Sequence, residues 1–308
     1  MTNIRNFLIL FFFFIGFIAN VNAQKDAKGF AKYTFACTDY TGGRVCIISG
    51  EGKLLWEYPA EQCNDLWVLP NGNLLFNTGH GVKEVTRGKK VVFSYESKSE
   101  IFACQRLANG NTFIGECNSG VLLEVAPNGK IVKKVKLLPD SVNGGHAYMR
   151  NARKLKNGNY LVAHYGLDKV SEYDPEGRLV KDFPVKGGPH SAIRLPNGNT
   201  LIACSDHKGE PRIVEMDKSG DIIWQLSKNE LPGIELKFMT GMEVQPNGNL
   251  VLTNWLGHNN LGKAPHAFEI TRDKRIVWVY NDHSIVKTIS NIQLLDSHGK
   301  PLKGNVLH

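Results

Sequence analysis

The sequence predicts an all-β fold, a six-bladed β-propeller of four-stranded antiparallel blades. Three observations predict it: one hairpin motif recurs five times, a second hairpin motif recurs six times, and the two ends of the chain carry complementary strands. Repeats of this length with strand-turn-strand content are typical of propeller blades, which are small sheets arranged around a central axis.

The first motif is an Asn-Gly-Asn turn between two apolar runs. It begins at Asn71, Asn109, Asn157, Asn197 and Asn247, at spacings of 38, 48, 40 and 50 residues. An Asn-Gly pair between apolar segments is a strong signal for a hairpin with a two-residue turn, in which both turn residues adopt positive φ. We therefore expect each copy to join strands A and B of one blade.

The second motif is a strand, a polar turn and a strand rich in β-branched or aromatic residues, as in "SGEGKLLWEY" and "MDKSGDIIWQL". Its six copies predict strands C and D of six blades. The chain begins with a B-like strand, "KYTFACTD", and ends with an A-like strand, "SNIQLLDSHG". The C-terminal strand would therefore complete the first blade, which removes the open sheet edges that invite aggregation.

Residues 1–23 have the pattern of a secretory signal peptide. Arg5 precedes an apolar run over 7–18, and the small-x-small sequence Val21-Asn22-Ala23 precedes Gln24. The run is shorter than the ~20 residues that a membrane span needs. We expect a secreted or periplasmic protein with no membrane anchor after cleavage, in which residues 24–308 form a single propeller domain.

Charge and cysteine content narrow the choice of partners. The net charge of +8 is spread over many lysines without the clustering of arginines and aromatic residues typical of nucleic-acid binding, so we expect no nucleic-acid partner. We also expect a monomer, an expectation for which the sequence carries no direct signal. The six cysteines suit an oxidising compartment and match no zinc-ligand spacing. Cys37 and Cys46 flank a short turn, and two alternatives stay open for them: a cross-strand disulfide or buried free thiols.

The "LPNGNxL" hairpin followed by a "DxxGxIxW" hairpin resembles secreted propellers of the PQQ-like and arylsulfotransferase-like groups. The resemblance covers nearly all of the chain after residue 30 and concerns the fold, which is a poor guide to activity. Quinoprotein dehydrogenases hold PQQ in larger rings of blades with a pair of adjacent cysteines. This sequence has no adjacent cysteine pair, and six blades make a narrower centre, so we expect no PQQ and no other cofactor.

The B–C and D–A connections vary in length, and such loops on a rigid scaffold usually carry binding residues. Six of the ten histidines fall on this rim. Aligning the blades on the turns makes Cys37, Thr78, Glu116, His164, Cys204 and Asn254 the last residues of the B strands. The predicted catalytic residues are His146, His190, His164, Arg150 and Tyr165. The predicted ligand-binding residues are Asn64, Asp65, Glu116, Arg153, His207, Asn254 and Trp255.

The resulting functional hypothesis is recognition of a small or carbohydrate-like ligand at the channel mouth on this rim. Whether a histidine-centred reaction accompanies binding stays open. The resemblance implies sulfuryl transfer through a channel histidine as one alternative, and His164, Tyr165 and Arg150 would suit a polysaccharide lyase as another. A non-catalytic interaction scaffold is the third. No HxH or HExxH spacing supports a metal site, and we expect no bound metal.

Overall fold

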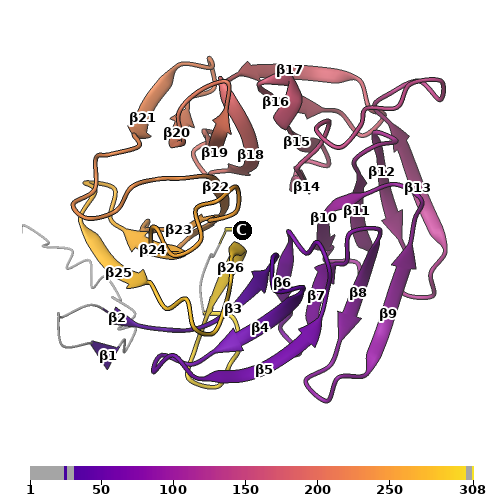
Figure 1. Cartoon of the computed structure of the whole chain (residues 1–308). Helices are drawn as coiled ribbons and strands as arrows, with labels where there is room; N and C mark the ends of the chain where they lie inside the picture. Colours follow the sequence, from indigo (N-terminus) through magenta and orange to yellow (C-terminus); the bar gives the residue numbers. More distant parts are fainter. Residues whose placement is uncertain (1–23, 26–30, 303–306) are drawn as a thin grey trace, which may run out of the picture.

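In the computed structural model, six four-stranded antiparallel sheets surround a central axis (Figure 1). The structure describes residues 24–25, 31–302 and 307–308, so the predicted signal peptide, residues 1–23, lies outside the described residues. The six-bladed fold is confirmed, and so is the closure of the first blade by the C-terminal strand.

Each blade contains strands A to D from the axis outward. Blades 1 and 2 consist of β26 (Ile289–Leu295), β3 (Thr34–Asp39), β4 (Arg44–Ile48) and β5 (Leu54–Pro59), and of β6 (Leu66–Val68), β7 (Leu74–Asn77), β8 (Gly81–Val85) and β9 (Val91–Glu96). Blades 3 and 4 consist of β10 (Ile101–Arg106), β11 (Thr112–Glu116), β12 (Val121–Val125) and β13 (Ile131–Lys136), and of β14 (Asn151–Lys154), β15 (Tyr160–His164), β16 (Lys169–Tyr173) and β17 (Leu179–Pro184).

The last two blades follow the same order. Blades 5 and 6 consist of β18 (Gly187–Arg194), β19 (Thr200–His207), β20 (Arg212–Met216) and β21 (Ile222–Leu226), and of β22 (Met239–Val244), β23 (Leu250–Asn254), β24 (Ala267–Ile270) and β25 (Ile276–Tyr280). A separate two-stranded sheet pairs β1 (Gln24–Lys25) with β2 (Ala31–Lys32), and one 3-10 turn, η1, spans Tyr165–Leu167. No helix in the described part of the chain is long and apolar enough to cross a membrane.

The Asn-Gly-Asn hairpins form where they were expected, but the prediction of two residues with positive φ is wrong. In blade 2 the Gly72 N–H donates to the Leu69 carbonyl and the Leu69 N–H donates to the Asn73 carbonyl, which makes a three-residue turn. Only Gly72 has a positive φ, 87°. The Asn71 side-chain oxygen instead accepts the Asn73 N–H at 3.0 Å. This bond stabilises a turn in which Asn71 keeps a negative φ and the glycine after it adopts the positive one.

The second asparagine of the turn motif forms a hydrogen bond with a glutamate of its own sheet, and that glutamate forms an ion pair with an arginine of the next blade. Asn73 Nδ2 donates to Glu84 Oε1 at 2.7 Å, and the same glutamate pairs with Arg106 of blade 3 at 2.5 Å. Asn159, Glu172 and Arg194 repeat the arrangement between blades 4 and 5. The motif therefore has a structural role on the face opposite the variable loops.

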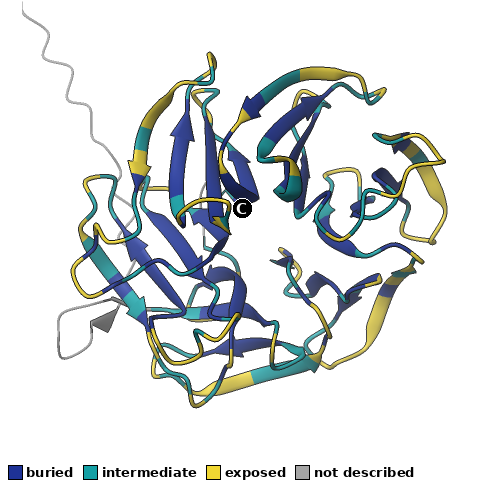
Figure 2. Cartoon of the chain, turned by 45° about the horizontal axis from the view of Figure 1, so that its top comes forward, coloured by how far each residue is buried: buried dark blue, intermediate teal, exposed yellow. Residues whose placement is uncertain are grey.

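The core is divided among the interfaces between neighbouring blades. The described residues form six hydrophobic clusters, and each cluster draws its side chains from two adjacent blades. Figure 2 shows the inner strands buried and the outermost strands largely exposed. Strand β26 contributes Ile292 and Leu294 to the cluster between blades 6 and 1, and Leu295 to the cluster between blades 1 and 2. The closing strand thus completes two interfaces.

The cysteines are all buried and free. Cys37 and Cys46 lie directly opposite each other in the β3–β4 register, so the structure presents the thiol form of the two alternatives. Burial, the largest influence, raises the pKa of the Cys37 thiol well above its ordinary value. A thiol in this environment is a poor nucleophile, which agrees with a packing role.

Candidate functional site

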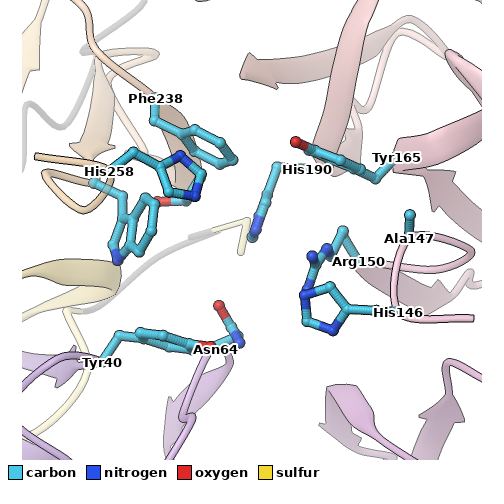
Figure 3. Close-up of a pocket in the computed structure, with 11 residues that line it drawn as sticks. Tyr40, Asn64, His146, Ala147, Arg150, Tyr165, His190, Phe238 and His258 are labelled. Atoms are coloured by element: carbon cyan, nitrogen blue, oxygen red, sulfur yellow. The ribbon is translucent and has the colours of Figure 1, made fainter. Parts of the chain in front are cut away.

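A cavity of about 290 Å³ lies on the face that carries the B–C and D–A connections (Figure 3). The side chains that line it come from blades 1, 2, 4, 5 and 6 and from the loops that lead into them. They are Tyr40, Asn64, His146, Ala147, Arg150, Tyr165, His190, Phe238, Thr240, Trp255 and His258. A concave site of this size, at the lower end of the usual range, accommodates a small molecule or one ring of a larger one.

Half of the residues predicted from the sequence meet in this cavity. The predicted residues that line it are Asn64, His146, Arg150, Tyr165, His190 and Trp255. The predicted residues that lie outside its lining are Asp65, Glu116, Arg153, His164, His207 and Asn254. Five of these six residues form side-chain hydrogen bonds with the protein, and the sixth, His207, packs against Tyr165.

His164 lies fully buried in blade 4. Its Nδ1 lies 2.9 Å from the Tyr148 carbonyl, and its Nε2 lies 2.9 Å from the Tyr173 hydroxyl, so both ring nitrogens have partners. The carbonyl can only accept, which makes Nδ1 the donor and Nε2 the acceptor of the Tyr173 proton. Burial lowers the pKa of His164 to about 4. The ring therefore acts as a neutral packing element.

Acid should destabilise the protein partly through this ring. The unfolded chain takes up a proton near the ordinary pKa of 6.5, whereas folded His164 takes it up only near pH 4, so stability falls as the pH drops below 6.5 and the loss is complete below about 4. The difference corresponds to roughly 3 kcal/mol. Urea unfolding at several pH values should show a shallower acid loss for His164→Gln than for the wild type, and parallel curves would contradict the assignment.

Asp65 and Arg153 form a buried ion pair near the axis. The guanidinium donates from Nη1 and Nη2 to the two carboxylate oxygens at 2.7 and 2.8 Å. Asp65 also accepts the Cys104 N–H at 2.9 Å and the Asn291 amide at 3.1 Å. Asp65 is completely buried, and the pair lies between the upper cavity, which Asn64 and Arg150 line, and a lower cavity, which Arg153 lines.

Glu116, Asn254 and His207 stabilise loops around the cavity. Glu116 accepts the hydroxyls of Tyr95, Ser97 and Ser119 within 2.8 Å. Asn254 accepts the backbone N–H groups of Lys237 and Phe238 on Oδ1, which fixes the loop that presents Phe238. The His207 ring packs on Tyr165 with a centroid distance of 4.8 Å and thereby supports it from behind.

Arg150 is the most unusual residue of the cavity. Its guanidinium carbon lies 4.4 Å from the Phe102 ring centroid and 5.2 Å from that of Tyr165. Among the arginines of the described residues, it alone donates no hydrogen bond from its guanidinium, and its Nε is buried without a partner. Burial lowers the pKa of Arg150, but a guanidinium keeps its charge in proteins.

His190 lies beside Arg150, and both side chains lie next to Tyr165 (Figure 3). The ring is 7% exposed and faces the cavity. Burial, followed by the positive charge of Arg150 and by His146, lowers the pKa of His190 to about 3. His190 is therefore a neutral imidazole at physiological pH, able to donate from one nitrogen and accept at the other.

Aromatic rings continue around the cavity from Arg150 to blade 1. Phe238 lies 5.7 Å from His190 and 5.1 Å from Trp255, and Trp255 lies 5.8 Å from Tyr40, all as centroid distances. The indole Nε1 of Trp255 is buried without a hydrogen-bond partner. We call the rings of Tyr40, Trp255, Phe238 and Tyr165 the aromatic arc. The arc offers apolar, flat surfaces for a ligand ring.

Sequence reasoning missed Tyr40 and Phe238. Strand B of blade 1 was expected to end at Cys37, but β3 extends to Asp39, two residues further. Tyr40 then follows the last residue of strand B, as Tyr165 follows β15 and Trp255 follows β23. A comparison of the residues that directly follow the B strands of blades 1, 4 and 6 would have identified Tyr40. Phe238 lies in the long connection before β22, where no repeat signal marks it.

The fold and the cavity define the class of this protein as a six-bladed β-propeller with a small-molecule-sized pocket on its loop-bearing face. No group of three or more His, Cys, Asp or Glu side chains in the described ranges is placed to hold a metal ion. The chain belongs to the Mal s 1 allergenic protein-like family, whose sequence profile matches residues 27–219, more than half of the chain. No curated protein matches the sequence.

Solved structures agree on the fold. The crystal structure of a protein of unknown function from Bacteroides caccae is similar, with 27% identity and a TM-score of 0.77 over 86% of this chain and 99% of that one. A streptogramin B lyase has 14% identity and a TM-score of 0.56 over 82% and 83% of the two chains. A catalytically inactive histidine-to-alanine variant of virginiamycin B lyase from Staphylococcus aureus, solved with quinupristin, is also similar. It has 14% identity and a TM-score of 0.57 over 92% of each chain.

Proposed function

We propose that this protein binds a small organic anion in the upper cavity and that Arg150 pairs with the anionic group. The observation that carries the proposal is the guanidinium of Arg150, which lines the cavity between two aromatic rings and forms no hydrogen bond with the described residues. Glu100 is close enough to act on Arg150 electrostatically but does not pair with it. A partly buried charge without a hydrogen-bonded counter-charge is unfavourable, and a carboxylate, sulfate or phosphate would pair with it through two parallel hydrogen bonds.

The remaining lining supports a ligand that carries a ring beside its charge. The aromatic arc can stack on the apolar face of a sugar or on an aromatic ring, while Asn64 and the neutral His190 can bond to hydroxyls. A carbohydrate-like acid satisfies both halves of the site. The signal-peptide pattern supports secretion or a periplasmic location, and we propose a monomer whose propeller occupies residues 24–308 and has no nucleic-acid partner.

Three alternatives from the sequence remain as outcomes to test. The resemblance to arylsulfotransferase-like propellers supports sulfuryl transfer, and the names of two structural neighbours support a lyase activity. A non-catalytic scaffold for protein partners would leave the unpaired Arg150 without a role. Compared with these three alternatives, binding of an organic anion gives a role to more of the cavity residues.

Replacing Arg150 with glutamine should weaken binding of anionic ligands by about 10- to 100-fold, the usual worth of a hydrogen-bonded charge. Suitable probes are 4-nitrophenyl glucuronide and 4-nitrophenyl sulfate, with the uncharged 4-nitrophenyl glucoside as the matched ligand. Calorimetry should show that the wild type prefers the charged probes and that Arg150→Gln abolishes the preference, with Arg150→Lys between them.

Arg178→Gln is the matched control, because Arg178 lies exposed on the opposite face in the turn between β16 and β17. It should bind the probes as the wild type does. Equal affinity of the wild type for charged and uncharged probes would overturn the proposal, and so would unchanged binding by Arg150→Gln. Release of nitrophenolate from the sulfate probe would identify sulfuryl transfer or hydrolysis.

A further inference from the structure

Glu100 and His146 form a pair at the edge of the cavity that the sequence did not predict. His146 Nδ1 lies 2.9 and 3.0 Å from the two carboxylate oxygens of Glu100. The carboxylate can only accept when it is ionised, so Nδ1 carries the proton and Nε2 is the nitrogen with the free lone pair. No described residue bonds to Nε2, and His146 lines the cavity.

The carboxylate of this pair is itself fixed. Asn118 donates from Nδ2 to Glu100 Oε2 at 3.1 Å, and Asn118 Oδ1 accepts the Glu100 N–H at 2.6 Å. Glu100 is mostly buried, with its side chain 19% exposed, whereas that of His146 is 57% exposed. A carboxylate that orients an imidazole and stabilises its protonated form is the usual arrangement for a histidine that removes protons.

Phe102 places this pair next to the anion-binding residue. The His146 ring packs edge-on against Phe102 with a centroid distance of 5.5 Å, and Arg150 stacks on the same ring at 4.4 Å. Figure 3 shows His146 directly beside Arg150, with Tyr40 across the cavity. The other titratable groups nearby are His190, Tyr165 and His258 in the cavity lining and Cys117, whose thiol contacts the His146 carbonyl. A base therefore lies beside the cation that would hold a ligand carboxylate.

We propose that His146, oriented by Glu100, is the general base of a β-elimination and that the substrate is a 4-O-linked uronide whose carboxylate pairs with Arg150. This inference rests on the proposed binding function. Pairing of the carboxylate with Arg150 stabilises the negative charge that develops when the neighbouring carbon loses its proton. The cavity accommodates one uronate ring, and the rest of the sugar chain lies outside it.

The proposed step balances as follows. His146 Nε2 takes the proton from the ring carbon next to the carboxylate, and the electrons of that C–H bond form a double bond to the adjacent carbon. The C–O bond at that adjacent carbon breaks, and the departing oxygen takes a proton from the Tyr40 hydroxyl. The products are an unsaturated uronate and an alcohol, and solvent returns the proton from His146 to Tyr40. No oxidant, reductant or metal is consumed.

His146 is a better base for this step than His190. His190 is 7% exposed and has no carboxylate partner, so burial and the neighbouring positive charge of Arg150 oppose its protonation. His146 has the carboxylate of Glu100 to stabilise the imidazolium that forms. Burial raises the pKa of Tyr40, which keeps its hydroxyl protonated until the leaving oxygen needs the proton.

The test uses the 4-linked galacturonate dimer as the probe and follows the ultraviolet absorbance of the conjugated product. The wild type should form the unsaturated uronate. Glu100→Gln should lower kcat by about 10- to 100-fold with KM unchanged, and Glu100→Asp should recover part of the loss, because an orienting partner acts on the reacting state. His146→Gln should lower kcat about 100-fold or more, and Glu176→Gln, exposed on the opposite face, should change nothing.

The possible outcomes distinguish a failure of the proposed elimination from a failure of the proposed anion binding. Binding of the dimer by the wild type without any unsaturated product would overturn the elimination and leave the binding function intact. Failure to bind the dimer while the nitrophenyl anions still bind would overturn the uronide substrate alone. Failure of every anion would overturn both. Circular dichroism and unfolding midpoints of the variants show that they are folded, and a normal kcat in a folded His146→Gln variant would also overturn the dyad.

Discussion

Replacing Asp65 with asparagine is expected to lower the free energy of unfolding by about 3–5 kcal/mol, because the variant leaves the Arg153 guanidinium buried without a counter-charge. The loss extends beyond the ion pair. Asp65 accepts hydrogen bonds from Cys104 of blade 3 and Asn291 of blade 1, so its carboxylate joins several blades at the axis. With Arg153 of blade 4 and its own place at the start of blade 2, Asp65 connects four blades.

Urea unfolding measures this effect, and a second substitution makes the test specific. Arg153→Met should also destabilise the protein, whereas the double variant with Asp65→Asn should recover part of the loss, because no buried charge is then left alone. Lys136→Ala breaks an exposed pair with Asp140 and should leave the unfolding midpoint unchanged. Additive losses in the double variant would contradict the proposed coupling between Asp65 and Arg153.

A chain that ends at residue 286 should fail to fold cooperatively. It lacks β26, which pairs with β3 from Ile289↔Asp39 to Leu295↔Thr34 and supplies side chains to two hydrophobic clusters. Its absence leaves the inner edge of blade 1 unpaired, and such an edge favours aggregation. Thermal unfolding should show no sharp transition, and size-exclusion chromatography should show aggregates.

A chain that ends at residue 299 is the matched control. It keeps β26 and loses only later contacts, such as the isolated bridge between Val244 and Leu307, so it should unfold cooperatively with a modest loss of stability. A synthetic peptide of residues 287–299 should also restore the transition when added to the shorter chain. An unchanged midpoint in the chain that ends at residue 286 would show that closure contributes little.

The fold could be predicted because it depends on local, repeated patterns. Turn residues and alternating apolar residues specify hairpins, and the excess of one strand at each end of the chain specifies the closure. The turn geometry could not be predicted, because an Asn-Gly pair suits both a two-residue turn and the three-residue turn that the structure shows at Gly72. In that turn Asn71 serves as an acceptor through its side chain.

The site could be predicted only in part, because the position of a residue in a repeat does not specify which side chains form hydrogen bonds with it. Arg150 and His190 were found because the repeat pattern placed both near the start of an inner strand; Arg150 directly precedes β14, and His190 lies within β18. His164 looked equivalent in sequence, yet its ring points into blade 4, where Tyr148 and Tyr173 occupy both nitrogens. Glu100 has no signal of its own, and only its distance to His146 reveals it.

The buried ion pair between Asp65 and Arg153 limits which ligands can enter the upper cavity and how they leave it. The two cavities share no lining residue, and Arg153 of the pair lines the lower one, so we expect a ligand to leave the upper cavity by the opening through which it came. We therefore expect that a long polymer does not pass along the axis. Under the proposed binding function, the site would favour the free end of a chain or a single small molecule, and the proposed elimination would shorten a polymer stepwise from its terminus.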